Sequence, residues 1–466
     1  MGGFFGVVSK EDCVKDLFYG TDYHSHLGTK RGGLAVKAQD GLNRFIHNIE
    51  NTQFRSKFDQ DIVNIQSKSG IGVISDYDDQ PLLIRSHLGN YAIVTVGAIK
   101  NVESIVKKSF KTRWLHFSEM SSGKINPTEL AAALINQGDT FEEGIQKAHD
   151  EIKGSCSMLI LTHEGIYAAR DKLGRTPVVI GKKQGSIAAT LETCAFPNLG
   201  YKIEKYLGPG EIVFITENGY EQKKVPEKPM QICSFLWVYY GYPASTYESI
   251  NVEDVRNRCG AILAKRHPVE IDYVAGIPDS GIGHGLGYAS TAGKPFKRPF
   301  VKYTPTWPRS FLPQNQAIRD LVAKMKLIPI RELIDGKRLL FCEDSIVRGT
   351  QLKGTIQRLY DVGALEVHMR AACPPLLYSC KFLNFSTSKS EMDLAARKVI
   401  KELEGNSPVD LKEYSKYGSE KYRAMEDRIR EKLTLTSLKY QSLDDLVRAI
   451  GLPKEKLCTY CWNGEE

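Results

Sequence analysis

The sequence predicts two domains of different class: an α+β domain rich in antiparallel strands, followed by an α/β domain with a parallel sheet. The chain has 466 residues, which is enough for two or three domains with well-filled cores. Up to about residue 220, short apolar runs alternate with glycine-containing turns, whereas beyond residue 250 strand-like and helix-like runs alternate. A polar stretch at 216–228, followed at once by Pro229, lies between these two patterns and is the predicted boundary.

In the first half, short apolar runs bounded by turn residues predict strands at residues 72–75, 91–96, 157–161, 186–189 and 211–215. Longer runs predict helices at residues 127–137 and 141–152. Antiparallel strands with few helices are typical of an α+β domain.

In the second half, we predict helices at 252–266, 281–292 and 351–363, and strands at 271–277, 300–303, 338–342 and 365–371. This alternation predicts a parallel sheet with helices on its faces and a ligand at the carboxyl ends of the strands. Residues 389–448 are charged and predicted to be largely helical. We therefore divide the chain into an α+β domain at 1–228, an α/β domain at 229–404 and a helical C-terminal extension at 405–466.

The composition excludes several classes of protein. Lys and Arg total 63 against 55 Asp and Glu, and the net charge of +8 is spread without a long basic run, so we expect no nucleic-acid partner. No apolar stretch approaches the ~18 residues of a membrane span, and the first residues lack a basic leader, so we expect a cytoplasmic protein. The ten cysteines are then reduced thiols or metal ligands.

An acidic loop after the strand at 338–342 carries the clearest chemical signal. Glu343 and Asp344 are followed by Ser345, Gly349 and Thr350 at the start of a helix. Amide groups and hydroxyls at a helix start can hold a phosphate, while the two acids bind sugar hydroxyls or Mg²⁺. A lone Ser-Gly-Thr would more simply be a turn with a helix cap, but the whole order of residues favours a sugar phosphate.

The string Glu-Asp-Ser-Ile-Val-Arg-Gly-Thr at 343–350 resembles the loop with which type I phosphoribosyltransferases bind 5-phosphoribosyl 1-pyrophosphate (PRPP). More narrowly, it resembles that of the glutamine PRPP amidotransferases, which usually have Asp where Glu343 stands. The loop at 278–281, Pro-Asp-Ser-Gly, is similar to the family's pyrophosphate loop. The resemblance implies that PRPP is bound by Asp279, Ser280, Glu343, Asp344, Ser345, Arg348, Gly349 and Thr350, and Mg²⁺ by Ser280, Glu343 and Asp344.

The same resemblance implies catalytic cations in a lid over PRPP. Lys302 and Arg309 are the residues to which it assigns this role. The stretch at 303–308 departs from the family in sequence and in length, which puts the contacts of the lid in question.

Two cysteines near the C-terminus, Cys458 and Cys461, have the Cys-x-x-Cys spacing of a redox pair, of half a zinc site or of two structural thiols. The family resemblance adds Cys233 and Cys380, at positions where iron–sulfur members have their other two ligands. It thus implies a 4Fe–4S cluster held by four thiolates from distant segments.

The first half resembles the family's N-terminal nucleophile hydrolase domain, which hydrolyses glutamine with an N-terminal cysteine. In this sequence the matching residue is Gly2, and the string Gly-Val-Ile-Ser at 72–75 stands where the family has an Arg that binds the glutamine carboxylate. The Asn-Gly pair that stabilises the oxyanion is matched by Val96 and Gly97, and an acidic contact by Asn126. The resemblance therefore implies a degenerate glutaminase site.

We expect an amidophosphoribosyltransferase-like glycosyltransferase of purine biosynthesis that makes 5-phosphoribosylamine from PRPP. Its nitrogen would be ammonia, free or delivered by a separate glutaminase, because its own glutaminase is predicted absent. Two alternatives remain open: phosphoribosyl transfer to a different nucleophile, and an inactive PRPP-binding regulator or scaffold. The family also implies a homo-oligomer, either a dimer or a tetramer.

Overall fold

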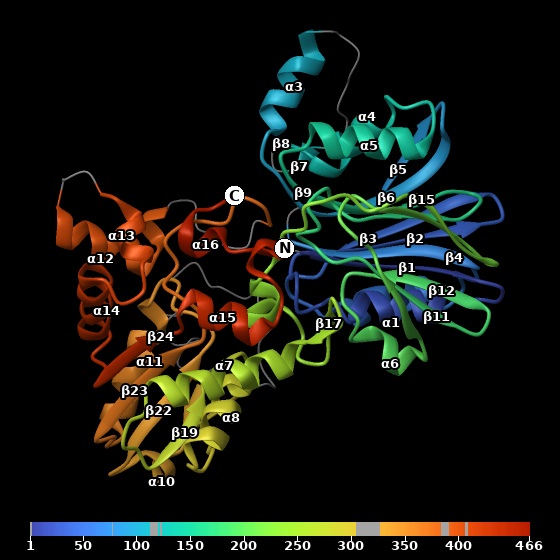
Figure 1. Ribbon diagram of the computed structural model, residues 1–466. Coiled ribbons are helices and arrows are strands. Elements are labelled where there is room, and N and C mark those ends of the chain that lie inside the picture. Colours follow the sequence, from blue (N-terminus) through green and yellow to red (C-terminus); the bar gives the residue numbers. More distant parts are fainter. Residues whose placement is uncertain are drawn as a thin grey trace.

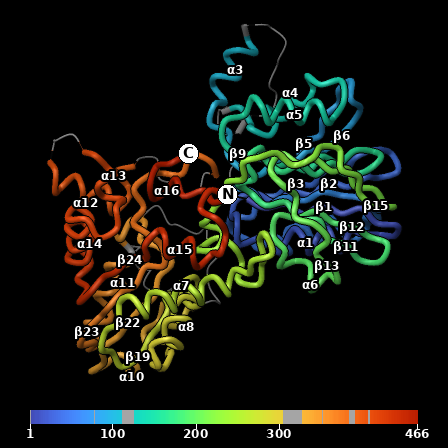
Figure 2. Tube along the Cα trace, viewed as in Figure 1, coloured from blue at the N-terminus to red at the C-terminus, as the bar shows by residue number. Residues whose placement is uncertain are grey.

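In the computed structural model, the residues described are 2–76, 78–111, 120–121, 124–303, 327–383, 391–405 and 409–466. They form two domains that meet at a junction near which both ends of the chain lie (Figures 1 and 2). Among these residues, no helix is long and apolar enough to cross a membrane.

The N-terminal domain consists of two stacked antiparallel sheets between helices (Figure 1). One sheet has the order β13-β11-β12-β1-β4-β2-β3, and its strands are β1 (Gly2–Ser9), β2 (Arg31–Ala38), β3 (Gly41–Asn48), β4 (Ser69–Ser75), β11 (Val179–Lys183), β12 (Ser186–Thr190) and β13 (Lys202–Tyr206). The other has the order β15-β14-β10-β9-β6-β5, and its strands are β5 (Leu82–Ser86), β6 (Gly89–Ile99), β9 (Gly154–Leu161), β10 (Ile166–Ala169), β14 (Ile212–Thr216) and β15 (Gly219–Lys224).

Strand alternation explains the layers of this domain. In β1, Phe4 and Val8 join the core between the sheets, whereas Phe5 and Val7 pack on the outer helices, because successive side chains of a strand point to opposite faces. The helices on this side are α1 (Val14–Asp22), α2 (Phe54–Ile62) and α6 (Ala195–Leu199). The opposite side is covered by α4 (Pro127–Ile135) and α5 (Phe141–Glu151), with α3 (Val102–Lys111) and the hairpin β7 (Met120–Ser121) and β8 (Lys124–Ile125) beyond them.

A junction segment with its own short elements leads into the second domain. It contains β16 (Ile232–Cys233), a π-helix at Leu236–Tyr240, β17 (Thr246–Tyr247) and β18 (Ile250–Asn251). Parallel pairing of β16 with β25 (Leu457–Cys458) brings the end of the chain back to this junction, with Cys233 opposite Cys458.

The C-terminal domain is built on a parallel sheet of order β19-β22-β23-β24. Its elements are α7 (Val252–Arg266), β19 (Tyr273–Gly276), α8 (Gly281–Ala292), β20 (Phe300–Lys302), β21 (Leu327–Pro329), α10 (Arg331–Ile334), β22 (Arg338–Glu343), α11 (Thr350–Asp361) and β23 (Glu366–Ala371). They are followed by a short helix at Glu391–Asp393, α12 (Ala395–Glu404), α13 (Leu411–Ser415), α14 (Glu420–Lys432), β24 (Ser437–Tyr440), α15 (Leu443–Ile450), a short helix at Lys454–Lys456, β25 and α16 (Tyr460–Asn463).

Each face of this sheet is covered by its own set of helices. Val274 and Leu340 pack on α7 and α8, whereas Ala275 and Phe341 face the side covered by α11, α12 and α14. The predicted α+β domain followed by an α/β domain with a parallel sheet is therefore confirmed.

The predicted strands and helices are confirmed with shifts of a few residues at their ends, but the extension at 405–466 is not wholly helical. Residues 437–440 form β24, which adds to the parallel sheet beside β23, a strand that the prediction of a largely helical stretch at 389–448 did not include. Buried Leu438 and Tyr440 alternate with partly exposed Ser437 and Lys439, which is the period of a strand. The run is only four residues long and lies between charged helices, so its pattern was too short to be recognised. The division at residue 404 stays a prediction.

Candidate active site

Two loops meet where β19 and β22 end side by side. These strands pair in parallel with Gly276 opposite Cys342, so the residues that follow them lie at the same edge of the sheet. The Ser280 hydroxyl donates a hydrogen bond of 2.5 Å to Asp344 Oδ2, and the Ser345 hydroxyl donates one of 2.5 Å to Oδ1. The fold thus brings together the two loops that the sequence singles out.

The two acids of this loop have unequal environments. Glu343 and Asp344 are both buried, and Glu343 Oε1 accepts a hydrogen bond from the backbone N–H of Asp344. Burial, and after it the charge of Asp344, raises the pKa of the Glu343 carboxyl well above its ordinary value. Oxygen ligands with uncompensated negative charge suit a hard divalent cation, so this pair fits Mg²⁺ chemically.

The loop ends at the start of α11. Gly349, just before this helix, has a φ of +74°, a left-handed conformation that glycine adopts without strain. The first backbone N–H groups of α11, beginning at Thr350, lie at the same end of the helix, where they can hold an anion. The arrangement can therefore take a phosphate group beside the two acids.

The other predicted PRPP residues lie around this centre. Lys302, at the end of β20, forms an ion pair of 2.6 Å with Asp279. Arg348 lies 3.9 Å from the carboxylate of Asp393. Arg309, and all of the stretch 303–308 except Tyr303, lie outside the described residues.

The predicted glutaminase positions lie in the strands of the N-terminal sheets. Gly2 pairs with Ser75 across β1 and β4, and a side chain on Gly2 would place its Cβ 2.4 Å from the backbone oxygen of Ile74. Val96 is buried in the core between the sheets. Gly97 has a φ of +137° and approaches the Ser155 carbonyl so closely that a Cβ would lie 2.0 Å from its oxygen.

Asn126, at the position where the family has an acidic contact, makes hydrogen bonds within the N-terminal domain. Its side-chain oxygen accepts the N–H of Thr128 as the cap of α4, and its amide donates to the Asp79 carbonyl at 3.1 Å. Both ends of this buried amide are therefore occupied by hydrogen bonds within the domain.

The four cysteines converge at the junction of the domains. Cys233 and Cys458 are opposite each other in β16 and β25, Cys461 is in α16, and its carbonyl accepts the N–H groups of Leu377 and Tyr378. Cys380 Sγ accepts the N–H groups of Phe382 and Leu383 at 3.4 Å each. All four thiols are free of disulfides.

Electrostatics link these four sulfurs to one another. Burial, followed by the charges of Cys458 and Cys380, raises the pKa of Cys233 well above its ordinary value. A hydrogen bond with Cys380, and after it burial, raises the pKa of Cys461 well above its ordinary value. Four thiolates could therefore be held here together only if a positively charged centre compensated them.

The chemistry of this set fits an iron–sulfur cluster. Across the described ranges, no three His, Cys, Asp or Glu side chains are grouped to hold one metal ion. A 4Fe–4S cluster makes a different demand, because each thiolate binds its own iron atom. Hydrogen bonds to Cys380 Sγ and the aromatic surroundings of Tyr460, which packs on Tyr378 and Phe382, suit such a group.

A cation from the N-terminal domain, Arg175, also lies beside the cysteines, and no motif in the sequence indicates this contact. The guanidinium carbon of Arg175, which is 4% exposed, lies 3.6 Å from the ring centre of Phe382. Its backbone carbonyl accepts the N–H of Cys233. Burial raises the pKa of Cys458, while the Tyr460 N–H and the charge of Arg175 oppose that rise.

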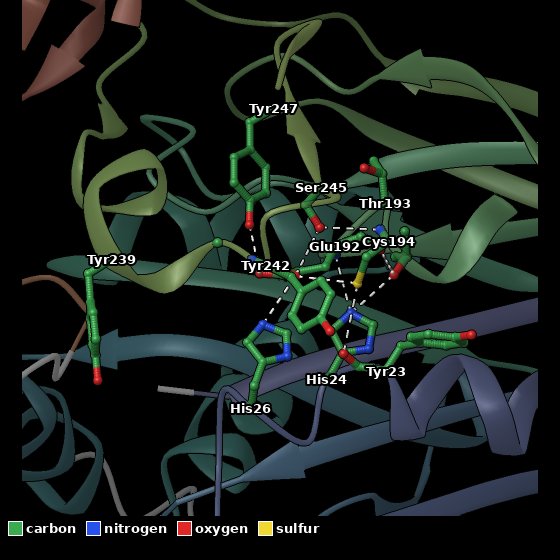
Figure 3. Close-up of polar contacts among 12 residues, drawn as sticks. Tyr23, His24, His26, Glu192, Thr193, Cys194, Tyr239, Tyr242, Ser245 and Tyr247 are labelled. Carbon is green, nitrogen blue, oxygen red and sulfur yellow. Dashed lines mark hydrogen bonds and ion pairs between the residues drawn. The ribbon is translucent and has the colours of Figure 1, made fainter. Parts of the chain in front are cut away.

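Figure 3 shows a second contact between the domains, centred on Glu192 at the end of β12. This fully buried carboxylate forms an ion pair of 3.2 Å with His26 and accepts hydrogen bonds from the junction segment. His24 is bound by the Gly20 carbonyl, the Thr190 hydroxyl and the Glu192 N–H. The His24 ring therefore supports the turn after α1.

Known proteins match this chain over its whole length. A profile of the glutamine amidotransferase domain matches residues 67–196. The amidophosphoribosyltransferase of Methanocaldococcus jannaschii is 29% identical, and the match covers 100% of this chain and 97% of that protein. The amidophosphoribosyltransferase of Bacillus subtilis is also 29% identical, and the match covers 86% of this chain and 85% of that protein.

Solved structures of the same kind of enzyme also resemble this chain. Glutamine PRPP amidotransferase from Bacillus subtilis, complexed with ADP and GMP, superposes with a TM-score of 0.85 at 26% identity, covering 99% of this chain and 96% of that one. The expected N-terminal nucleophile hydrolase fold and type I phosphoribosyltransferase fold are thereby confirmed. By sequence and by fold, the chain is a relative of the amidophosphoribosyltransferases and carries a glutamine amidotransferase domain.

Proposed function

We propose that this chain transfers ammonia to PRPP and releases 5-phosphoribosylamine and pyrophosphate, as a step of purine biosynthesis. The observation that carries the proposal is the meeting of Ser280 with the Asp344 carboxylate at the edge of the parallel sheet. The names of the relatives support the same reaction.

The reaction needs positioning more than proton transfer. The nitrogen lone pair bonds to the anomeric carbon while the bond from that carbon to the pyrophosphate oxygen breaks, and its electron pair leaves with pyrophosphate. The bound nitrogen then gives a proton to solvent. Ser280, Glu343 and Asp344 would hold Mg²⁺, which would neutralise charge on the departing pyrophosphate.

The residues of this chain supply the remaining contacts. Asp279, Ser345, Arg348, Gly349 and Thr350 are proposed to bind the phosphates and the ribose through hydroxyls, amides and charge. Lys302 and Arg309 are proposed to stabilise the leaving group.

We further propose that the nitrogen does not come from glutamine cleaved by this chain. Gly2 offers no side chain as a nucleophile, and its close approach to Ile74 leaves no room for a Cβ. Val96 and Gly97 offer no side-chain donor for an oxyanion. Ammonia would then be free or supplied by a separate glutaminase, and assembly into dimers or tetramers is part of the same proposal.

A single assay tests this function. Pyrophosphate release from PRPP is measured with anaerobically handled protein and Mg²⁺, with ammonium, with glutamine or with neither. Release with ammonium alone supports the proposal. Release with neither would indicate hydrolysis of PRPP by water. Absence of release under all conditions, with PRPP still bound, would indicate either a different acceptor or an inactive regulator or scaffold, and a screen of other nucleophiles would separate these two.

We expect neither the wild-type protein nor Gly2→Cys to form glutamate from glutamine above the uncatalysed background. The cysteine cannot be accommodated beside the Ile74 carbonyl without a shift of the strand. Glutamate is measured directly, and ammonium-dependent pyrophosphate release by both proteins serves as the control for folding. Glutamate formation by the wild-type protein would contradict the proposed nitrogen source.

The cysteine site is proposed to hold a 4Fe–4S cluster on Cys233, Cys380, Cys458 and Cys461. For Arg175→Gln we expect a loss of about 2–3 kcal/mol in the free energy of unfolding, because this buried cation donates to Gln231 at 2.9 Å and stacks on Phe382. Urea unfolding under anaerobic conditions measures the change.

The matched control for this variant is Lys172→Gln, from the same loop. Lys172 is half exposed and pairs only with surface Asp150 in the contacts described, so its removal should cost no more than about 0.5 kcal/mol. Equal effects of the two variants would show that Arg175 has no special role at the junction.

A further inference from the structure

Within the junction segment, residues 236–247 are bound toward their C-terminal end by a carboxylate of the N-terminal domain. Glu192 accepts hydrogen bonds from the Tyr247 hydroxyl at 2.6 Å, the Ser245 hydroxyl at 3.0 Å and the Tyr242 backbone N–H at 3.3 Å (Figure 3). Glu192 and Tyr247 are fully buried, and hydrogen bonds to a buried charge are among the stronger ones.

The charge of Glu192 is itself stabilised within the N-terminal domain. Burial by itself would raise the pKa of Glu192, but the charge and hydrogen bond of His26, with the hydrogen bond of Tyr247, lower that pKa to about 2. The His26 ring also packs on the Tyr242 ring at 5.3 Å. Glu192 therefore stays ionised at neutral pH.

The N-terminal end of the junction segment is bound by Arg256 from α7. Its guanidinium donates to the carbonyls of Trp237 at 3.1 Å and of Tyr239 and Gly241 at 2.9 Å each. Burial lowers the pKa of Arg256, and the charge that opposes this most strongly is that of Asp344. Arg256 also packs on α8, because a Cβ on Gly283 would lie 3.0 Å from the Cβ of Arg256.

A second contact leads from this segment to the other PRPP loop. The ring of His284, in α8, donates from Nε2 to the Val238 carbonyl at 3.2 Å, and His284 is fully buried. Helix α8 begins at Gly281, directly after Ser280. The loop with Ser280 therefore leads directly into a helix that contacts the segment held by Glu192, and Ser280 is joined to the other loop by its hydrogen bond to Asp344.

We infer that Glu192 is a positioning residue for PRPP binding, because it holds the junction segment against Arg256 and His284 and so sets the two loops that carry Asp344 and Ser280. This gives the N-terminal domain a role in phosphoribosyl transfer that does not require glutamine chemistry. The inference rests on the proposed binding of Mg–PRPP.

The test compares Mg–PRPP affinity by calorimetry in the wild-type protein and in Glu192→Gln, which keeps the shape of the side chain but removes its charge. We expect the affinity to fall about tenfold, within the usual range of coupling between linked sites. Tyr247→Phe removes one hydrogen bond to Glu192 and keeps the ring, which packs on Trp237 at 5.7 Å, so its effect should be smaller but in the same direction.

Glu248→Gln is the matched control. Glu248 forms another ion pair across the domains, with Arg170 at 2.7 Å, and it follows the stretch 236–247 that Glu192, Arg256 and His284 bind. This variant should weaken the domain contact, seen in its melting temperature, and leave Mg–PRPP affinity within about twofold of wild type.

Three results would overturn the inference. Unchanged affinity in both Glu192→Gln and Tyr247→Phe would make Glu192 a structural residue only. An equal loss in Glu248→Gln would indicate general damage to the junction. Failure of the wild-type protein to bind Mg–PRPP would contradict the proposed function itself. This result is distinguishable from the other two because it is seen without any substitution.

Discussion

Replacing Asp344 by asparagine is expected to reduce ammonium-dependent release of pyrophosphate from PRPP by about a hundredfold or more. The Asp344 carboxylate receives the hydroxyls of Ser280 and Ser345, one on each oxygen, and it is proposed to supply charge to Mg²⁺. An amide of the same shape keeps the fold but lacks that charge and has one acceptor fewer. The rate is measured at saturating ammonium and PRPP.

The neighbouring acid provides the matched comparison. Burial, and after it the charge of Asp344, raises the pKa of Glu343, and glutamine resembles the neutral form that such surroundings favour. Glu343→Gln should therefore lose activity by about tenfold or less. A larger loss in Glu343→Gln than in Asp344→Asn would show that the charge of Glu343 matters more to the reaction than that of Asp344.

Replacing Cys458 by serine is expected to lower bound iron from about four atoms per chain to below one after anaerobic reconstitution. Serine has no thiolate to bind iron, and Cys458 lies opposite Cys233 in the strand pair that ties the tail to the junction. Iron and sulfide analysis and the visible absorption spectrum measure the loss. The melting temperature should fall as well, because a bound group stabilises the state that binds it.

Cys156→Ser is the control, because it also replaces a buried thiol by a hydroxyl but lies away from the four cysteines of the proposed cluster. Cys156 is buried in β9 of the N-terminal domain, among the side chains that pack on α4 and α5, so its variant should be less stable but retain its iron. If the wild-type protein binds no iron after reconstitution, the cysteines are structural thiols. Loss of iron in both variants would point to unfolding as its cause.

Much of the candidate active site could be predicted from sequence because its residues are consecutive. The acids, hydroxyls and glycine of 343–350 form one string between a strand and a helix, and the structure has β22 and α11 at those places. The alternation of strands and helices also predicted that the loops after β19 and β22 would meet at one edge of a parallel sheet. For the four cysteines, spacing alone left three interpretations open, and the family resemblance was needed to connect Cys233 and Cys380 with the tail.

Other features had no local signal. Strand β24 has four residues among charged helices and is defined by its pairing with β23. Arg175 follows an ordinary turn, and nothing nearby in sequence indicates that it stacks on Phe382. Glu192 is an acid just after a strand, and its partners Tyr242, Ser245 and Tyr247 lie some fifty residues further along the chain.

Residue identity and short-range order were sufficient for the class of each domain, for the phosphate-binding string and for the absence of a side chain at Gly2. These properties depend on neighbours in the chain, which the sequence lists directly. Folding was needed to bring Ser280 to Asp344, to converge the four cysteines and to bury Glu192 between the domains. Such contacts join segments far apart in sequence, and their energies arise from burial and pairing that exist only once the domains have packed together.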